Sequence, residues 1–264
     1  MKNRNVVIDP DRCTGCGVCT KDCFSGKLLL EDGRVVPQSP CNGCGHCVAI
    51  CPQGAASIPE YPLPGPDFLS DGPGVSPEAL LELIRRRRSI RQYRAQAVEP
   101  ETVAEILEAG RYSATGGNRQ DVAYVAVREA FPALRTEIWE SLGRMAEQGD
   151  RPYAAKWQQM YCAWKADPAD DRLFFGAPML LVVLSGRLFE AGMAAQSIEL
   201  AACANKLGVL YSGFIVDALR ESERALRMLG IPDGGQVAIA MLLGYPAVHY
   251  RRAAPRRPVE VHWL

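Results

Sequence analysis

Two segments after residue 75 carry apolar residues at the spacing of an α-helix. The first begins at Ser76-Pro77-Glu78, which supplies an N-cap hydroxyl, a proline at the first helical position and an acid that suits the helix dipole. A second helix is predicted to begin near Glu99-Pro100-Glu101. The apolar positions are Leu80, Leu81, Leu83 and Ile84 in the first segment and Val103, Ile106 and Leu107 in the second.

Three longer apolar runs predict buried strands, at residues 122–127, 178–185 and 236–244. Residues 193–208 are apolar and small on almost every side, which predicts a helix inside a core or an oligomer interface, with Gly208 as its C-cap. Strands mixed with long helices favour a layered fold, and we expect the α+β class.

The segment before these elements has a different composition. Residues 58–77 contain six prolines and three glycines, so they cannot form a helix or a central strand, and the prolines stiffen them. We therefore expect a small domain at residues 1–57, a linker at 58–75 and a larger domain at 76–264.

Composition narrows the function classes. The formal net charge is zero, which gives no sign of nucleic acid or an anionic membrane surface as a partner. The sequence has no run of about 18 apolar residues, so no membrane span is expected. The segment MKNRNVVIDP lacks the apolar core of a secretory signal, and we expect a cytoplasmic protein.

Two cysteine runs carry the clearest chemistry. Both CTGCGVCTKDC and CNGCGHCVAIC follow C-x2-C-x2-C-x3-C, the spacing that holds iron–sulfur clusters. In two-cluster ferredoxins the fourth ligand comes from the other run. That pattern predicts two [4Fe–4S] clusters, one held by Cys13, Cys16, Cys19 and Cys51 and the other by Cys41, Cys44, Cys47 and Cys23.

Zinc and disulfides are the competing interpretations of these cysteines. Zinc sites usually use two C-x2-C pairs, and three cysteines per loop would crowd one tetrahedral ion. Disulfides need an oxidising compartment. Residues 1–57 resemble the bacterial two-cluster ferredoxins over their whole length. Phe24 stands where the first run of that family often has proline, which changes a turn and leaves the ligands intact.

Two polar segments of the larger domain could bind a phosphate and a polyol chain. RRRRSIRQY, residues 85–93, offers guanidinium groups and a hydroxyl where a helix should end, although a charge run is usually a solvated face. SATGGNRQD, residues 113–121, offers the side-chain amides of Asn118 and Gln120, each a donor and an acceptor. Glycines beside them allow a close approach of the backbone.

Together these segments resemble the FMN-dependent nitroreductase family across residues 76–264. The motifs that carry the resemblance are Arg87-Arg88-Ser89-x-Arg91, Asn118-Arg119-Gln120, Ala177-Pro178, the small-residue helix, the YSGF at 211–214, Gly244-Tyr245-Pro246 and the PRRP at 255–258.

The resemblance implies an α+β homodimer with FMN at two equivalent interface sites. It assigns Arg87, Arg88, Ser89 and Arg91 to the FMN phosphate and ribityl chain, completed by Arg256 together with Arg257. It further implies that Ala114, Thr115 and Gly116 approach the ring from the partner subunit, that Asn118 and Gln120 lie against the flavin, and that Ser212 and Gly213 lie near N5 and O4. The family often has Pro-Trp after N-x-Q, and Asp121-Val122 here affects substrate preference more than FMN binding.

The expected function joins the two domains. The clusters would collect single electrons, and FMN would pass them in pairs to a small electrophile such as a nitroaromatic, a quinone or an activated alkene. No catalytic side chain is expected, because the flavin carries the chemistry. Reduced ferredoxin is one expected donor. Two alternatives stand beside this function. The protein could be a nitroreductase that takes electrons directly from NAD(P)H at the flavin, or a non-catalytic electron-transfer module.

A row of aromatics suggests a lid. Tyr153, Trp157 and Tyr161 are spaced by four and would share one helix face. That face either packs on the core or covers the flavin and stacks an aromatic substrate.

Overall fold

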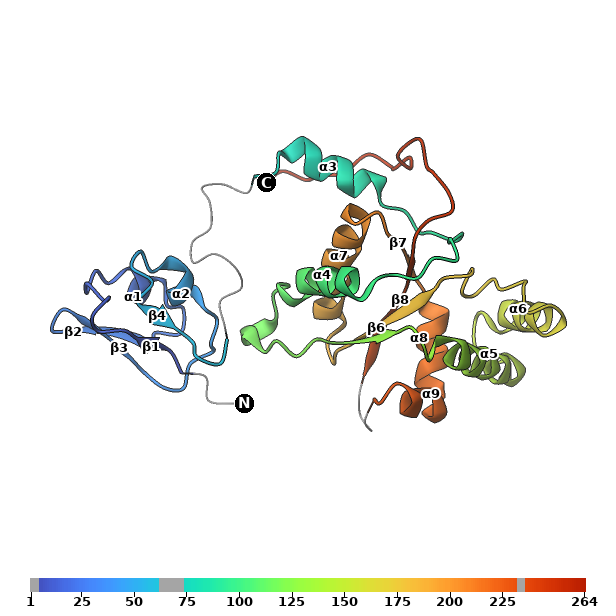
Figure 1. The fold of residues 1–264 in the computed structure, drawn as a ribbon, viewed down its shortest axis with the longest axis horizontal. Helices are drawn as coiled ribbons and strands as arrows, with labels where there is room; N and C mark the ends of the chain where they lie inside the picture. The colour runs from blue at the N-terminus through green and yellow to red at the C-terminus, as the bar shows by residue number, and fades with distance from the viewer. Residues whose placement is uncertain (1–4, 62–73, 232–235) are drawn as a thin grey trace. The chain divides into compact units, whose positions relative to one another are not determined.

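The computed structural model describes residues 5–61, 74–231 and 236–264, and its chain divides into two compact units (Figure 1). The first unit comprises Met1–Gly74 and Thr115–Gln120, and the second comprises Val75–Ala114 and Asp121–Leu264. Most of the predicted linker, residues 62–73, lies outside the described residues.

The described residues of the first unit form two small antiparallel sheets, two short α-helices and a 3-10 helix at Gly116–Asn118. Strand β1 (Val7–Ile8) pairs with β4 (Ala56–Ser57), and β2 (Leu28–Glu31) pairs with β3 (Arg34–Pro37). Asp32 and Gly33 join β2 to β3, and both have positive φ, as a tight hairpin turn requires. Helices α1 (Val18–Asp22) and α2 (His46–Ile50) follow the two cysteine loops.

The second unit contains a four-stranded antiparallel sheet in the order β5-β6-β8-β7. The strands are β5 (Ala123–Val127), β6 (Met179–Leu184), β7 (Gly208–Tyr211) and β8 (Val237–Gly244). The three predicted strands are thus confirmed, whereas β7 was not predicted. Mixed helices and strands confirm the α+β class.

Helices cover both faces of this sheet (Figure 1). Leu180 and Val182 of β6 pack with α5 (Phe131–Gln148), α6 (Ala154–Ala166) and α8 (Gly213–Glu221). Leu181 and Val183 pack on the other face with α4 (Pro100–Arg111) and α7 (Leu188–Ala204). Alternate side chains of a strand point to opposite faces, so a continuous apolar run fits a strand that is buried on both sides. Two further helices are α3 (Pro77–Arg86) and α9 (Glu223–Met228).

The helix starts agree with the capping signals, but one helix end does not. Ser76 Oγ accepts a hydrogen bond from the backbone N–H of Ala79 at 3.2 Å, as an N-cap should. The prediction that Gly208 caps α7 is wrong. The helix ends at Ala204, Lys206 turns the chain with φ of 62°, and Gly208 already belongs to β7.

Gly208 is needed for close packing instead. A Cβ at this position would lie 2.9 Å from a ring carbon of Pro246 and closer still to Ile90.

None of the helices in the described parts of the chain has the length and apolar character that a membrane crossing requires.

Candidate functional site

Each cysteine run folds into a loop followed by one short helix. Gly17 and Gly45 stand immediately before α1 and α2 with φ of 72° and 77°, the left-handed conformation that glycine adopts at little cost. The fourth cysteine of each run, Cys23 or Cys51, follows its helix with extended backbone. The helix therefore separates the fourth thiol from the first three.

The structure gathers the eight cysteines into two groups of four, and each group combines three cysteines of one run with the last cysteine of the other. We name each cavity after the first cysteine of the run that supplies three of its four cysteines. The Cys13 cavity is lined by Cys13, Cys16, Cys19 and Cys51. The Cys41 cavity is lined by Cys23, Cys41, Cys44 and Cys47. Four thiols around a closed space are the donor set that a [4Fe–4S] cluster takes, so the residues present fit such a group.

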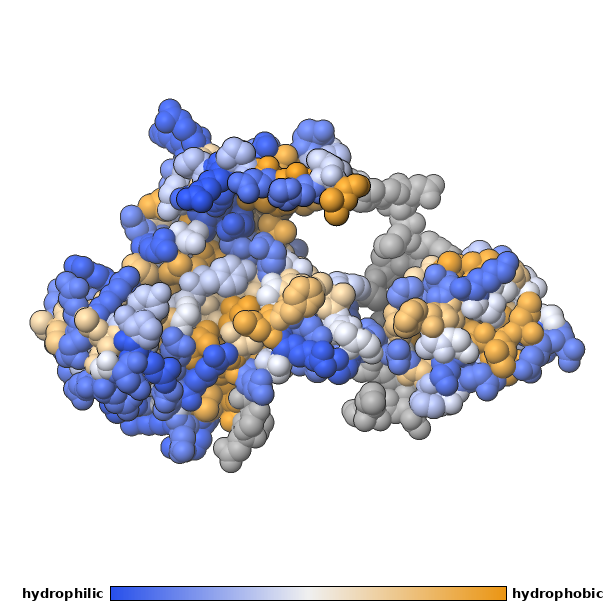
Figure 2. Space-filling model, turned by 180° about the vertical axis from the view of Figure 1, so that it is seen from behind, coloured by the Kyte–Doolittle hydropathy of each residue, from blue (hydrophilic) through white to orange (hydrophobic). Residues whose placement is uncertain are grey.

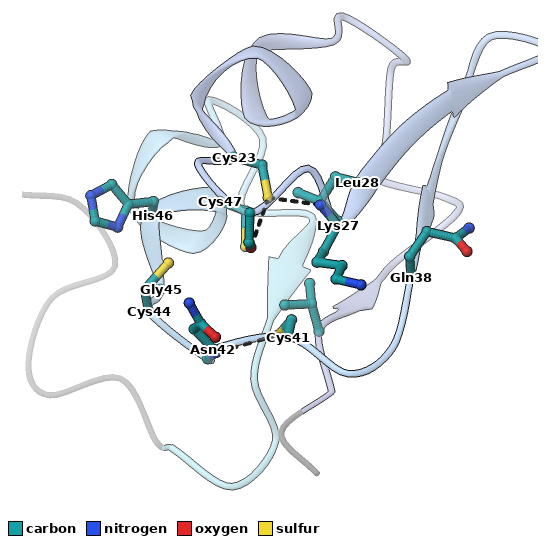
Figure 3. A pocket seen from close by; sticks show the side chains of 13 residues that line it. Cys23, Lys27, Leu28, Gln38, Cys41, Asn42, Cys44, Gly45, His46 and Cys47 are labelled. Carbon is teal, nitrogen blue, oxygen red and sulfur yellow. Dashed lines mark hydrogen bonds between the residues drawn. The ribbon is translucent and has the colours of Figure 1, made fainter. Parts of the chain in front are cut away.

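Figure 3 shows the Cys41 cavity at close range. The side chains of Cys23, Cys41, Cys44 and Cys47 surround one space, whereas the His46 ring points away from it. In the described residues, no three or more His, Cys, Asp or Glu side chains are arranged to hold a single metal ion. All ten cysteines of the chain are free of disulfides.

Backbone N–H groups point at several of the sulfurs. The N–H of Lys27 lies 3.2 Å from Cys23 Sγ, and the N–H of Ala55 lies 3.2 Å from Cys51 Sγ. Burial opposes ionisation of Cys23, but the backbone N–H of Lys27 together with the Ser25 hydroxyl lowers its pKa below the ordinary value, and the N–H of Ala55 does the same for Cys51. The ends of the two runs therefore stabilise thiolate, the form that ligates iron.

The buried cysteines behave in the opposite way. Burial, and next the neighbouring Cys44, raises the pKa of Cys47 to about 11. Burial also raises the pKa of Cys19. Both side chains are therefore protonated at neutral pH, and each would have to lose its proton to ligate iron.

A cationic cavity lies in the second unit at the end of α3. Arg87 and Arg88, both predicted for the FMN phosphate, line it. The remaining lining is Arg86, Ile90, Glu199, Cys203, Lys206, Leu207, Gly208, Val209, Pro246, Val248, His249 and Tyr250. The excess of positive charge suits a phosphate, and the apolar residues suit the carbon skeleton of its ester.

Two contacts hold the arginines of this cavity in place. Arg87 Nη1 lies 3.3 Å from Glu199 Oε1, and Glu199 is buried with 3% of its surface exposed. Gln196 Nε2 donates to the other carboxylate oxygen of Glu199 at 3.2 Å. The guanidinium of Arg88 lies over the Tyr250 ring, 5.3 Å from its centroid. Both guanidinium groups are therefore oriented before any ligand arrives.

The other residues predicted for FMN lie outside the lining of this cavity. Ser89 pairs with Val209 through an isolated β-bridge, and Ser212 caps α8 by accepting from the N–H of Ile215. Several residues predicted to bind FMN are exposed to solvent in the single chain, namely Ser89, Arg91, Ala114, Gly116, Gln120, Gly213, Arg256 and Arg257. A single chain thus brings together two of the predicted FMN residues, and their joint role stays a prediction.

Residues Thr115–Gln120, which include the predicted flavin contacts Asn118 and Gln120, belong to the first unit. There the Asn118 side-chain amide donates to the carbonyl of Gly43 at 2.7 Å and to that of Asn42 at 3.3 Å. Asn118 and Gln120 both have φ of 51°. No local pattern predicts these contacts, because Asn118 and Gly43 are 75 positions apart.

The row of predicted lid aromatics splits into three environments. Trp157 is 1% exposed and belongs to the core. Tyr161 lies against Gly143 and donates its hydroxyl to Glu140 at 2.6 Å. Tyr153 is 55% exposed and packs against Phe214, with ring centroids 5.4 Å apart. Tyr153 alone retains the exposure that stacking on a substrate would require.

Three residues of the cationic cavity were missed by sequence reasoning. Glu199 lies within an apolar helix, and an acid in such a helix is a signal that a buried cation partner is needed. Lys206 and Tyr250 lie in connecting segments, and no spacing rule relates them to Arg88.

The comparisons with known proteins match both units. Residues 84–245 match the model of the "Nitroreductase family", and residues 5–52 match that of the "4Fe-4S dicluster domain". A curated relative, 4-nitrobenzoate reductase of Nocardioides sp. (strain LMS-CY), is 26% identical over 225 residues, which cover 70% of this chain and 89% of that protein.

Two solved structures share the fold of the larger unit. A nitroreductase with bound FMN from Desulfitobacterium hafniense DCB-2 has a TM-score of 0.55 at 23% identity, covering 69% of this chain and 98% of that one. A nitroreductase with bound FMN from Bacteroides fragilis NCTC 9343 has a TM-score of 0.58 at 20% identity, covering 70% and 98%. The predicted pairing of a ferredoxin-type segment with a nitroreductase-type domain is confirmed.

Proposed function

This chain belongs to the nitroreductase family, and from that premise we propose that it is an iron–sulfur flavoenzyme. Two [4Fe–4S] clusters pass single electrons to FMN, which reduces a small electrophile by two electrons. The observation that carries the proposal is the division of eight cysteines into two groups of four, in a chain that also holds a nitroreductase domain.

The residues at hand suit FMN as the second cofactor. Arg87 and Arg88 are oriented toward a cationic cavity and would hold the phosphate. Ser212 stands at the N-terminus of α8, where backbone N–H groups favour an electron-rich ligand edge. When bound, FMN supplies the ability to take electrons singly and deliver them in pairs.

The proposed substrate class is the nitroaromatics, with quinones and activated alkenes as related electrophiles. The name of the curated relative supports a nitroaromatic, since that protein is a 4-nitrobenzoate reductase. Tyr153 is exposed and packs against Phe214, which directly follows Gly213 at the start of α8, and it offers an aromatic surface for such a ring. The ten free cysteines suit a reducing compartment, and we propose the cytoplasm.

A homodimer is the proposed assembly. Helix α3 has no buried residue, and even its apolar side chains Leu80, Leu81 and Ile84 are 47%, 43% and 42% exposed. Trp263 near the chain end is 90% exposed. Figure 2 shows hydrophobic residues at the surface in this region, at the top of the view. A short helix is marginal without tertiary packing, so a second copy that covers it is a physical reason for the dimer.

The test removes one cluster and follows the electrons. Replacing Cys41 and Cys44 with serine should abolish reduction of a nitroaromatic by reduced ferredoxin and leave the bound FMN content unchanged. Cys162→Ser is the matched control, because Cys162 is exposed and lies outside both runs. Full turnover in the double variant would contradict the proposed route.

A further inference from the structure

The two cysteine runs are repeats of one another, so equivalent positions can be compared directly. Residues 13–27 read CTGCGVCTKDCFSGK, and residues 41–55 read CNGCGHCVAICPQGA. Both runs place a left-handed glycine before a five-residue helix. In both, the N–H four positions after the last cysteine lies 3.2 Å from its sulfur. The frame around the two cavities is therefore the same.

The charges next to the two cavities do not distinguish them. Lys27 lines the Cys41 cavity, and Arg12 lines the Cys13 cavity. Each cavity thus has one cation in its lining, and the long-range effect of these charges on a cluster is similar on the two sides.

Backbone N–H groups reach the last cysteine of both runs, and a side-chain donor distinguishes the two cavities. The Ser25 hydroxyl lies 3.7 Å from Cys23 Sγ in the Cys41 cavity, and it must be the donor when that sulfur ligates iron and carries no proton. The N–H of Gly43 also lies 3.3 Å from Cys41 Sγ. Gln53 occupies the position equivalent to Ser25, and in the described residues no side-chain hydroxyl is recorded at Cys51.

The other lining residues differ in the same direction. The polar side chains that line the Cys41 cavity are Ser25, Lys27, Gln38 and Asn42, beside the apolar Val6 and Leu28, while the His46 ring points away from it. The Cys13 cavity is lined instead by the apolar Ile8, Val35, Pro52, Ala55 and Ala56 besides Arg12, Thr14 and Gln53. A reduced cluster carries one more negative charge than an oxidised one. Donors at its sulfurs and a polar surround stabilise that charge and raise the reduction potential.

We infer that the two clusters are not equivalent, and that the cluster in the Cys41 cavity has the higher reduction potential, with Ser25 as the side chain that sets the difference. A single electron delivered to the cluster in the Cys13 cavity would pass on to the cluster in the Cys41 cavity. The first cluster would then be oxidised again and the second would be reduced. The inference rests on the proposed function, because it requires both clusters.

The test is an anaerobic redox titration of the full chain with both clusters loaded, followed by electron paramagnetic resonance. Two midpoints are expected, with at least a tenfold preference of the electron for one cluster, which corresponds to 59 mV for a one-electron couple. Ser25→Ala should lower the higher midpoint and leave the lower one unchanged. Ser25→Thr keeps the hydroxyl and should keep the wild-type potentials.

The repeat supplies the matched control. Gln53→Ala changes the equivalent position of the other cavity and should leave the higher midpoint unchanged. Coincident midpoints in the wild type, an unmoved higher midpoint in Ser25→Ala, or a shift of the lower midpoint alone would each overturn the inference.

Iron and sulfide analysis separates this inference from the proposed function. About eight iron atoms per chain are expected for two loaded clusters. A full iron content with coincident midpoints overturns only the inequality of the clusters. An iron content near zero after anaerobic reconstitution overturns the clusters themselves, and the inference falls with them.

Discussion

Replacing Gly15 with alanine should damage the first cysteine loop far more than the same change at Gly45. Both glycines have positive φ, 68° and 77°, so alanine costs about 1–2 kcal/mol at either position from backbone strain alone. A Cβ on Gly15 would in addition overlap the carbonyl oxygen of Gly33 in the hairpin turn, whereas a Cβ on Gly45 meets nothing within 4 Å.

The difference between the two variants isolates the overlap. Backbone atoms cannot rotate aside as a side chain can, and overpacking of this kind costs about 1–3 kcal/mol. In a domain of 60–100 residues each kcal/mol shifts the unfolding midpoint by about 4–8 °C. Gly15→Ala should therefore lose its cluster absorbance on anaerobic heating at least about 4 °C below Gly45→Ala. Equal midpoints would refute the reasoning from the hairpin contact.

Three further outcomes concern the second unit. Gly143→Ala should lower the free energy of unfolding by about 1–3 kcal/mol, because the new Cβ would lie 2.7 Å from a ring carbon of Tyr161. Glu199→Ala should lower it by about 1–3 kcal/mol, because Arg87 loses its buried hydrogen-bond partner. The hydroxyl of Tyr161 lowers the pKa of Glu140 below the ordinary 4.5, so the stability that this pair contributes is complete above that pH. It is lost as the pH falls through the lowered pKa.

Denaturant unfolding followed by tryptophan fluorescence measures all three effects. Gly192→Ala is the control for Gly143→Ala, because Gly192 lies inside α7 and a Cβ added there meets nothing within 4 Å. This change should raise the free energy of unfolding by about 0.5–1 kcal/mol. Destabilisation by both alanines would contradict the packing argument at Gly143. Tyr161→Phe is the control for the pH effect, and an unchanged pH profile in that variant would rule out the pair as its source.

The elements that could be predicted are those whose signal is local. Ser76 caps α3 through a hydrogen bond to a residue three positions away, and the strand of β6 is one continuous apolar run. The grouping of Cys51 with Cys13, Cys16 and Cys19 followed from cysteine spacing, since a tight loop supplies three of four ligands.

The parts that escaped prediction depend on contacts between distant residues. Helix α7 was expected to continue to Gly208, because small apolar residues mark no end, and β7 was lost inside that expectation. Glu199 reaches Arg87 across 112 positions. The aromatic row at Tyr153 and Trp157 was predicted as one face, yet the structure buries one ring and exposes the other.

An anaerobic visible spectrum of the purified protein tests the central claim most directly, recorded as NADH, NADPH and then reduced ferredoxin are added. The account predicts that reduced ferredoxin bleaches the flavin band through the clusters and that neither nicotinamide does so. Bleaching by NADH or NADPH, with no response to reduced ferredoxin, would contradict it and make the cysteine cavities an outlet for electrons that enter at the flavin.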